Sequence, residues 1–413
     1  MRNIFKNKEL IYLLFASFFI RVLVAYFYSD NILRNEWSMI LHNYKISGIF
    51  GFNVVINENL AIPKFAEIGE KVLPTVFMPP LYLYFIYFIK ILSNDLINLA
   101  SLIVFLQIFL SLISISMIYL IAKTLTNNNI FFTRVCTLTF AFFPINIYAS
   151  SQISSASLQI LLTLVFFYFL LLILKSIKLY HVIIFSFISG LLILIRGEFL
   201  LLYFFSLAYI FVYFKKLYKF ILVSLILTLI TISPYLIRNY QYFETFTLTK
   251  SFGYNLLKGN NPSYKVEGDI KIIEKIKSDE KNINLDNKYE INLDNLFKEK
   301  AFNFIKNNPI EYFKLYILKI ISFLFIDINS TYPYYYNFFH IFPKILISIT
   351  SLAGAIISIK RKSFYQFLSL YFFLNIFLFS VFFILPRYSL ILLPVQILLS
   401  IQFIKYLRGK FFN

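Results

Sequence analysis

The chain has 413 residues and a formal net charge of +19; 59% of its residues are apolar, whereas only 14% are charged. Because soluble domains average about 25% charged residues, this composition excludes a disordered chain, a coiled coil and an ordinary soluble enzyme. The apolar residues form long uncharged runs near the ~20 residues that span a bilayer, so we predict an all-α polytopic membrane protein.

The first apolar run extends from Leu10 to Tyr28 and follows a basic amino terminus. It lacks a convincing small-residue cleavage site, so we interpret it as a spanning helix with its amino terminus in the cytoplasm. Residues 29–78 then form a first external loop. Within this loop, Arg34-Asn35-Glu36-Trp37 places a carboxylate just above the membrane. Glu36 is either a solvated loop acid or a general base that faces a site at the membrane surface.

The first external loop ends at Phe77-Met78-Pro79-Pro80-Leu81-Tyr82, where the double proline fixes an extended approach to the next helix. Tyr82 is either an aromatic residue of the membrane interface or part of a binding site. Further apolar segments bring the predicted bundle to about 11–12 hydrophobic helices. They lie near residues 79–93, 96–122, 130–149, 153–174, 180–195, 198–214, 217–237, 311–326, 337–359, 364–385 and 388–407.

The segments 180–195 and 198–214 are short and are separated by Arg196-Gly197-Glu198. They form either one broken helix or a hairpin. Arg196 lies almost within the membrane, where a charge needs a partner. Its side chain is either paired locally with Glu198 or a ligand for a phosphate group.

The region from Arg238 to Ile310 is the long hydrophilic stretch of the sequence, and we predict that it forms a larger external loop. Between Lys265 and Lys300 it holds 9 acidic and 8 basic residues, a net charge of −1, so the rest of the chain carries +20. The basic excess therefore belongs to the membrane part, where Lys and Arg flank helices on the cytoplasmic side. We accordingly predict a lipid bilayer as a partner and no nucleic acid.

At the start of this loop, Pro234 to Tyr240 leaves the membrane, and a Gly/Asn-rich stretch follows from Gly253 to Pro262. Glycines provide tight turns and accessible backbone amides that can hold an oxyanion or a sugar. Arg238 is either an arginine that snorkels at the interface or a ligand of the same group. The asparagines of the stretch that are candidates for the same role are Asn255, Asn260 and Asn261.

Later in the loop, Asn284 to Asn295 is predicted to be irregular and Phe297 to Asn307 to be a helix that stops before Pro309. If the loop is outside, only an odd number of crossings can separate it from a basic cluster inside, so one of the segments 311–326 and 337–359 is not a crossing. The positive-inside rule places three clusters in the cytoplasm, namely Lys215-Lys216, Lys360-Arg361-Lys362 and Lys405 to Lys410.

Pro386-Arg387-Tyr388 precedes the last helix and lies at the external face in this topology. The positive-inside rule disfavours an arginine on the external face, so the presence of Arg387 there needs another explanation. A phosphate at the membrane surface supplies one, because a guanidinium binds phosphate through two parallel hydrogen bonds.

The sequence lacks the motifs of several common nucleotide-binding, hydrolytic and metal sites. There is no Walker A sequence, no GxSxG, no HExxH and no Cys/His metal cluster. The single cysteine, Cys136, rules out an intrachain disulfide.

Taken in order, these pieces resemble the bacterial GT-C glycosyltransferases of the protein O-mannosyltransferase and aminoarabinose transferase superfamily, over nearly the whole chain. The pieces that carry the resemblance are Asn35-Glu36, the "PPLY" of Pro79 to Tyr82, Pro144 with Tyr148 and Ser150, Gly190 to Arg196, Pro234 to Tyr240, Gly253 to Pro262, Ile305 to Pro309 with Lys319, and Arg387 with Tyr388, Leu390 and Pro394.

The resemblance implies a GT-C-like bundle in which residues 1–237 form the catalytic membrane module, 238–310 an external loop and 311–413 the carboxy-terminal helices. It implies an enzyme of the bacterial inner membrane that moves a monosaccharide from a polyprenyl phosphate to a glycan, lipid or protein hydroxyl on the periplasmic side. Glu36 is then the base, and the anomeric centre is inverted. The implied donor site comprises Arg238, Arg387, Arg196, Tyr82, Asn255, Asn260, Asn261 and Tyr388.

Two positions depart from the family pattern. Asn35 stands where relatives often carry a first acid, and Asp30 is the nearest substitute. Phe77 and Met78 stand where some relatives carry an acid that helps to hold a metal; here Glu70 is the nearest acid. We therefore predict no metal ligands and leave a divalent cation open.

Two other classes of function compete with the glycosyltransferase. An O-antigen polymerase or ligase would use polyprenyl-diphosphate glycans, but the acidic first loop argues against it. A lipid or solute transporter would typically show inverted repeats, and the sequence shows no such symmetry.

Overall fold

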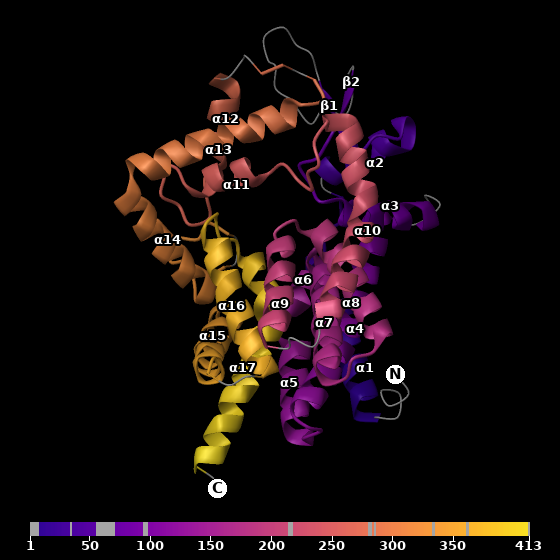
Figure 1. Cartoon of the computed structure of the whole chain (residues 1–413), viewed down its shortest axis with the longest axis vertical. Coiled ribbons are helices and arrows are strands. Elements are labelled where there is room, and N and C mark those ends of the chain that lie inside the picture. The colour runs from indigo at the N-terminus through magenta and orange to yellow at the C-terminus, as the bar shows by residue number, and fades with distance from the viewer. Residues whose placement is uncertain are drawn as a thin grey trace.

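The computed structural model describes residues 8–33, 35–54, 71–93, 98–213, 218–279, 283–284, 286–332, 335–360 and 363–411. This part of the chain is almost entirely helical, with one two-stranded sheet (Figure 1). The elements are α1 (Lys8–Tyr28), α2 (Asn35–Ser47), β1 (Gly51–Val54), β2 (Lys71–Pro74), α3 (Pro80–Ser93), α4 (Leu99–Leu125), α5 (Ile130–Phe142), α6 (Pro144–Ser151), α7 (Ala156–Lys175), α8 (Leu179–Ile195), α9 (Phe199–Tyr213), α10 (Tyr218–Phe243), α11 (Phe252–Gly259), α12 (Ile270–Asp279), α13 (Tyr289–Asn307), α14 (Pro309–Leu324), α15 (Phe338–Ser358), α16 (Phe364–Ser380) and α17 (Pro386–Phe411).

Six of the described helices are long and apolar enough to cross a membrane, namely α1, α4, α7, α10, α15 and α17. Helices α5 and α6 are bent by 46° at their junction and make a seventh such segment if they form one span. Helices α3, α8, α9 and α16 are apolar but shorter. Each apolar segment predicted from the sequence contains a helix, so the all-α membrane architecture is confirmed at this level.

The start of α1 and the end of α17 lie at the same end of the bundle (Figure 1). Arg134, at the start of α5, forms an ion pair with Glu9 of α1. Lys175, at the end of α7, donates to the carbonyl oxygen of Thr124 at 3.0 Å. Arg408, at the end of α17, lies 5.7 Å from the ring centroid of Phe131. This end therefore gathers basic residues, including the predicted cluster from Lys405 to Lys410; Lys215-Lys216 and Arg361-Lys362 lie outside the described residues.

Helices α8 and α9 form a hairpin, which decides between the two alternatives that the sequence left open. The rings of Phe185 and Tyr203 lie 6.3 Å apart, whereas a continuous helix over the same residues would separate them by about 27 Å. Gly190 permits the close approach of α8 to α10, because a Cβ atom there would lie 2.6 Å from Thr231.

The break between α5 and α6 comes at Pro144, which lacks the amide that would continue the hydrogen bonds of α5. Arg21 of α1 satisfies one carbonyl group at the end of α5, because its Nη1 donates to the carbonyl oxygen of Ala141 at 3.1 Å. The same side chain is fully buried, and its Nε donates to Ser111 of α4 at 2.9 Å. A charged side chain thus joins three helices inside the bundle.

The predicted first external loop contains ordered elements at the end opposite the termini (Figure 1). Strands β1 and β2 pair antiparallel, with Gly51 opposite Pro74. Helix α2 is fixed to β1 by the side-chain amide of Asn43, which donates to the carbonyl oxygen of Gly51 at 2.9 Å. The ring of Tyr44 stacks on that of Phe50 with centroids 3.9 Å apart. The described strands and the contacts around Phe50 therefore hold α2 in place.

The hydrophilic region after the membrane part of α10 is more helical than the sequence indicates. Helix α10 continues past Arg238 to Phe243, and α11 replaces the turns predicted between Gly253 and Pro262. Helix α13 begins at Tyr289, so the irregular structure predicted for Asn284 to Asn295 is wrong in its second half. The predicted helix end before Pro309 is confirmed.

A hydrophobic cluster explains these helices. Short helices in water are marginal, and they form in proteins because one face packs against a core. The cluster joins β2, α11, α12 and α13 through Leu73, Leu256, Leu257, Ile273, Tyr289, Leu293, Phe297 and Ala301. Burying each large side chain of this kind contributes roughly 1.5–3 kcal/mol.

Candidate functional site

The candidate catalytic acid, Glu36, lies in the first turn of α2. Neighbouring residues hold the helix in place: Ile40, one turn after Glu36, is fully buried, and the ring of Trp37 meets that of Tyr82 edge-on at 5.2 Å. Glu36 itself is half-buried, and within the described part of the chain its carboxylate has no hydrogen-bond or ion-pair partner. Arg34 and the side chain of Asn35 lie outside the described residues.

Helix α11 brings further polar side chains to the same place. Tyr254 and Lys258 are four residues apart and therefore share one face of this helix. Burial raises the pKa of Tyr254 to about 12, and the negative charges of Glu36 and Glu274 add to this effect. The effect indicates that the carboxylate of Glu36 and the phenol of Tyr254 lie within electrostatic range of each other.

Lys258 in turn lies close to Arg387, at the beginning of α17. Burial lowers the pKa of Lys258, and the positive charge of Arg387 lowers it further. The ammonium group packs over the ring of Phe383 at 4.4 Å from its centroid. Among the described residues, neither cation has a carboxylate partner. Two like charges held together without a counter-ion attract an anion.

Tyr388 and Arg196 extend this cationic region. The ring of Tyr388 lies 5.8 Å from that of Phe383, and the guanidinium of Arg196 lies 5.0 Å from the Tyr388 centroid. Arg196 also forms the local ion pair with Glu198, at 3.1 Å. Arg196 is therefore partly neutralised, whereas Lys258 and Arg387 are not.

Arg238 lies in a different environment. Its Nη1 donates to the carbonyl oxygen of Thr75 at 2.9 Å and to Asn239 Oδ1 at 2.7 Å, and its Nη2 donates to the carbonyl oxygen of Phe50 at 3.1 Å. Its guanidinium also lies 4.9 Å from the ring centroid of Tyr242. These contacts join α10 to the residues between α2 and α3, which we call the first external segment after the topology predicted from the sequence. They occupy most of the donors that a phosphate would use.

The remaining predicted donor-site residues differ in how accessible they are. Tyr82 is buried, and its hydroxyl donates to Gln107 Oε1 at 2.9 Å. The amides of Asn260 and Asn261 are buried and donate to backbone carbonyls at the end of α11. Asn255 is half-buried, and its side chain has no hydrogen bond within the described residues. Asp30, the substitute acid, accepts from the Ile153 amide at 2.8 Å.

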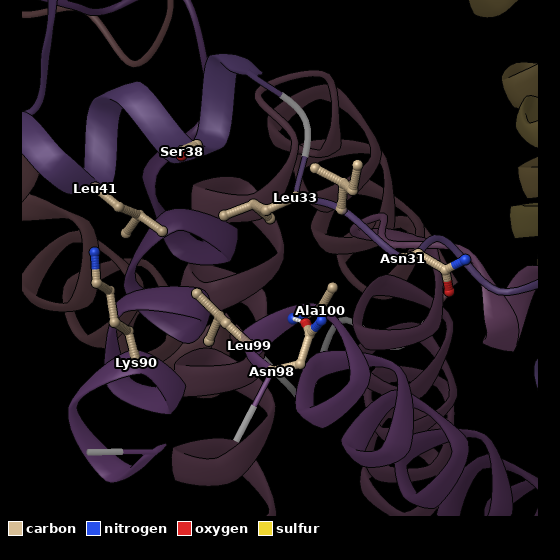
Figure 2. Close-up of a pocket in the computed structure, with 9 residues that line it drawn as sticks. Asn31, Leu33, Ser38, Leu41, Lys90, Asn98, Leu99 and Ala100 are labelled. Atoms are coloured by element: carbon tan, nitrogen blue, oxygen red, sulfur yellow. Dashed lines mark hydrogen bonds between the residues drawn. The ribbon is translucent and has the colours of Figure 1, made fainter. Parts of the chain in front are cut away.

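A shallow cavity of about 380 Å³ lies on the other side of α2. Figure 2 shows Lys90 reaching from α3 toward Leu41 of α2, with Leu99 of α4 nearby. Ser38 and Leu41 occupy the helix face roughly opposite to Glu36, because each helical residue turns by about 100°. The cavity is therefore separate from the cluster described above.

Tyr254 and Lys258 are the two residues of the cluster that sequence reasoning did not single out. It interpreted Gly253 to Pro262 as turns, in which side-chain direction has no period. The signal that identifies them is their spacing of four residues within a short amphipathic helix.

Within the described residues, no three His, Cys, Asp or Glu side chains come together, and Glu70 lies outside those residues. No protein-family model matches the chain, and no curated protein matches it. The assignment of a function therefore rests on the cluster itself.

Proposed function

We propose that the chain is a membrane glycosyltransferase of the GT-C type, which moves a monosaccharide from a polyprenyl phosphate to an acceptor hydroxyl at the external face of a bacterial inner membrane. The observation that carries the proposal is a carboxylate, Glu36, that raises the pKa of Tyr254, together with two cations, Lys258 and Arg387, that lie close enough for one to lower the pKa of the other. Among the described residues, none of these three charges has an ion-pair partner. Helices α2 and α11 and the beginning of α17 lie toward the end of the bundle opposite the start of α1 and the end of α17 (Figure 1).

In this reaction Glu36 accepts the proton of the acceptor hydroxyl as its oxygen attacks the anomeric carbon. The bond from that carbon to the phosphate oxygen breaks, and its electron pair leaves with the phosphate. Attack from the side opposite the phosphate inverts the anomeric centre. Tyr254, with its raised pKa, stays protonated and can donate a hydrogen bond to the sugar.

The two cations act mainly on the leaving group. The donor is a phosphodiester with one negative charge, whereas the released phosphomonoester carries up to two. Lys258 and Arg387 therefore stabilise the departing phosphate more than the bound donor, which is the condition for lowering a barrier. The apolar helices beneath the cluster give an isoprenoid tail a place in the bilayer.

The test is incubation of membranes containing the protein with a panel of labelled polyprenyl-phosphate sugars, followed by identification of the labelled product. We expect transfer by the wild type and none above background by Glu36→Gln. The matched control is Glu274→Gln, because Glu274 also raises the pKa of Tyr254 but is an exposed residue of α12; it should retain activity. If Glu274→Gln loses transfer and Glu36→Gln retains it, Glu36 is not the base and the proposal names the wrong carboxylate.

A second arm offers polyprenyl-diphosphate oligosaccharides. Transfer from these donors alone, with none from the monophosphates, would replace the proposal by a polymerase or ligase. Absence of transfer from either class would contradict a glycosyltransferase.

A further inference from the structure

The carboxylate of Glu290 on α13 accepts several hydrogen bonds from the first external segment. Thr75 Oγ1 lies 2.8 Å from Oε1 and 3.0 Å from Oε2, and the amide of Val76 donates to Oε2 at 2.8 Å. These residues come directly before the double proline that begins α3. The acid therefore joins two stretches more than 200 positions apart in the sequence.

Asp294 lies one helical turn further along α13 and acts on α11. Its Oδ1 accepts from the Tyr254 amide at 2.9 Å, in the first turn of that helix. The amides of a first helical turn have no partner within their own helix, so an acid from elsewhere satisfies them and stabilises the positive end of the dipole. Residues four apart share one helix face, so Glu290 and Asp294 present their carboxylates on the same side of α13.

The two segments that these acids hold are in direct contact. The ring of Phe77, next to Val76, meets the ring of Tyr254 edge-on with centroids 5.2 Å apart. The backbone of α11 also lies very close to α13, because a Cβ atom on Gly253 would lie 1.9 Å from the carbonyl oxygen of Asp294. Helix α13 thus fixes both partners of this ring contact.

A short chain of contacts continues from Thr75 to α2. The Thr75 amide donates to the carbonyl oxygen of Phe50 at 2.9 Å, and Arg238 donates to the same oxygen at 3.1 Å. The ring of Phe50 stacks on Tyr44 of α2. Movement of the segment around Thr75 is therefore transmitted to the helix that carries Glu36.

We propose that Glu290 and Asp294 are positioning residues, which hold the first external segment against α11 so that Glu36 faces Tyr254 and Lys258 in the geometry that transfer requires. This inference rests on the proposed function for its kinetic consequence, although the contacts can be tested without it. Neither acid touches the substrate in this proposal; both act through the segments that they fix.

The kinetic test compares Glu290→Ala and Glu290→Gln with Glu299→Ala, a change at an exposed acid of the same helix. A displacement of about 1 Å costs up to roughly 100-fold in rate, so we expect Glu290→Ala to lower kcat roughly 10- to 100-fold. The KM for the donor should stay unchanged, because Lys258 and Arg387 remain in place. Glu290→Gln keeps one acceptor oxygen and should recover part of the rate.

The structural test is hydrogen exchange by mass spectrometry on the full-length protein in detergent. Glu290→Ala should speed exchange of the peptides that contain Val76 and α2, and Asp294→Ala should do so at the start of α11. Glu299→Ala should leave all of these peptides unchanged.

Each result has one meaning. Unchanged exchange at Val76 in Glu290→Ala would overturn the proposed contact. Faster exchange with an unchanged kcat, or a rise in donor KM with kcat unchanged, would overturn the positioning role. If the wild type transfers no sugar, the proposed function is wrong. If hydrogen exchange is unchanged in the variants, the inference about α13 is wrong, whatever the outcome for transfer.

Discussion

The ammonium of Lys319, fully buried on α14, donates to Asn260 Oδ1 at 2.8 Å. The amide of Asn260 in turn donates to the carbonyl oxygens of Leu256 and Val381, each at 2.8 Å. One asparagine therefore joins the end of α11, helix α14 and the segment that leads to Arg387. Asn260 thereby helps to position Lys258 and Arg387.

This junction predicts unequal effects on stability. Asn260→Ala leaves a buried ammonium without its partner and should cost about 3–5 kcal/mol. Lys319→Met leaves only an amide oxygen unsatisfied and should cost about 1–3 kcal/mol. The double variant should cost less than the sum, because the two groups share one interaction. Denaturant unfolding in detergent measures this, with Lys314→Met on the exposed side of α14 as the control; strictly additive losses would contradict the coupling.

Lys258 predicts a pH dependence of transfer. Its pKa is lowered from 10.5 by burial and by Arg387, so the free enzyme loses this positive charge at a lower pH than an ordinary lysine would. Activity as kcat/KM should therefore fall on the alkaline side at a pH below 10.5. Bound phosphate favours the protonated amine, so the same fall in kcat should come at higher pH.

The variant Lys258→Arg keeps its charge throughout this range and should move the alkaline fall of kcat/KM upward while retaining activity at neutral pH. Profiles of kcat/KM from pH 6 to about 10 make the comparison. An unchanged alkaline limb in Lys258→Arg would show that another group titrates there.

Arg238 offers a choice between two roles with different signatures. Its bonds to Thr75 and Phe50 predict that Arg238→Lys, which cannot donate in a fork, loosens the first external segment. Hydrogen exchange around Thr75 should then increase while the donor KM stays the same. A raised donor KM with unchanged exchange would instead favour the phosphate-binding role that the sequence pattern predicts.

Gly253 is required for packing and not for a turn. Alanine there places its Cβ 1.9 Å from a backbone oxygen of α13, which cannot move independently of its helix. Overpacking of this kind typically costs about 1–3 kcal/mol or more. Gly409→Ala is the matched control, because open space surrounds that position. Equal melting temperatures for the two variants would show that α11 tolerates the displacement.

The sequence predicts the membrane part of the fold well because its signal is local. An apolar run of sufficient length forms a helix in a bilayer whatever its neighbours are, since no other partner exists for its backbone groups. Helices α2, α11 and the first half of α13 are different. They carry polar residues throughout, and their stability comes from contacts such as Leu257 with Phe297, which no local pattern reveals.

The candidate site likewise contains residues that the sequence identifies and residues that only the fold identifies. Glu36 and Arg387 stand out in the sequence because each is a charge next to an apolar run. Lys258 does not stand out, because its candidate role depends on the nearby charge of Arg387, which is distant in the sequence. The sequence pattern singles out Asn260 as a candidate ligand in a loop, whereas in the fold its amide is buried and bonded to backbone carbonyl groups.

The buried Arg21 has a consequence for the order of assembly. Helix α1 is synthesised before α4 and α5, yet its arginine bonds Ser111 and Ala141, which lie 90 and 120 positions later. An arginine at the centre of a lone spanning helix costs about 2.5–3.5 kcal/mol during insertion. Chains truncated after residue 93 should therefore insert α1 less completely than chains that extend to residue 151, as measured by protease protection. Helix α1 is thus completed by α4 and α5, and we expect the amino-terminal bundle to mature as a unit rather than helix by helix.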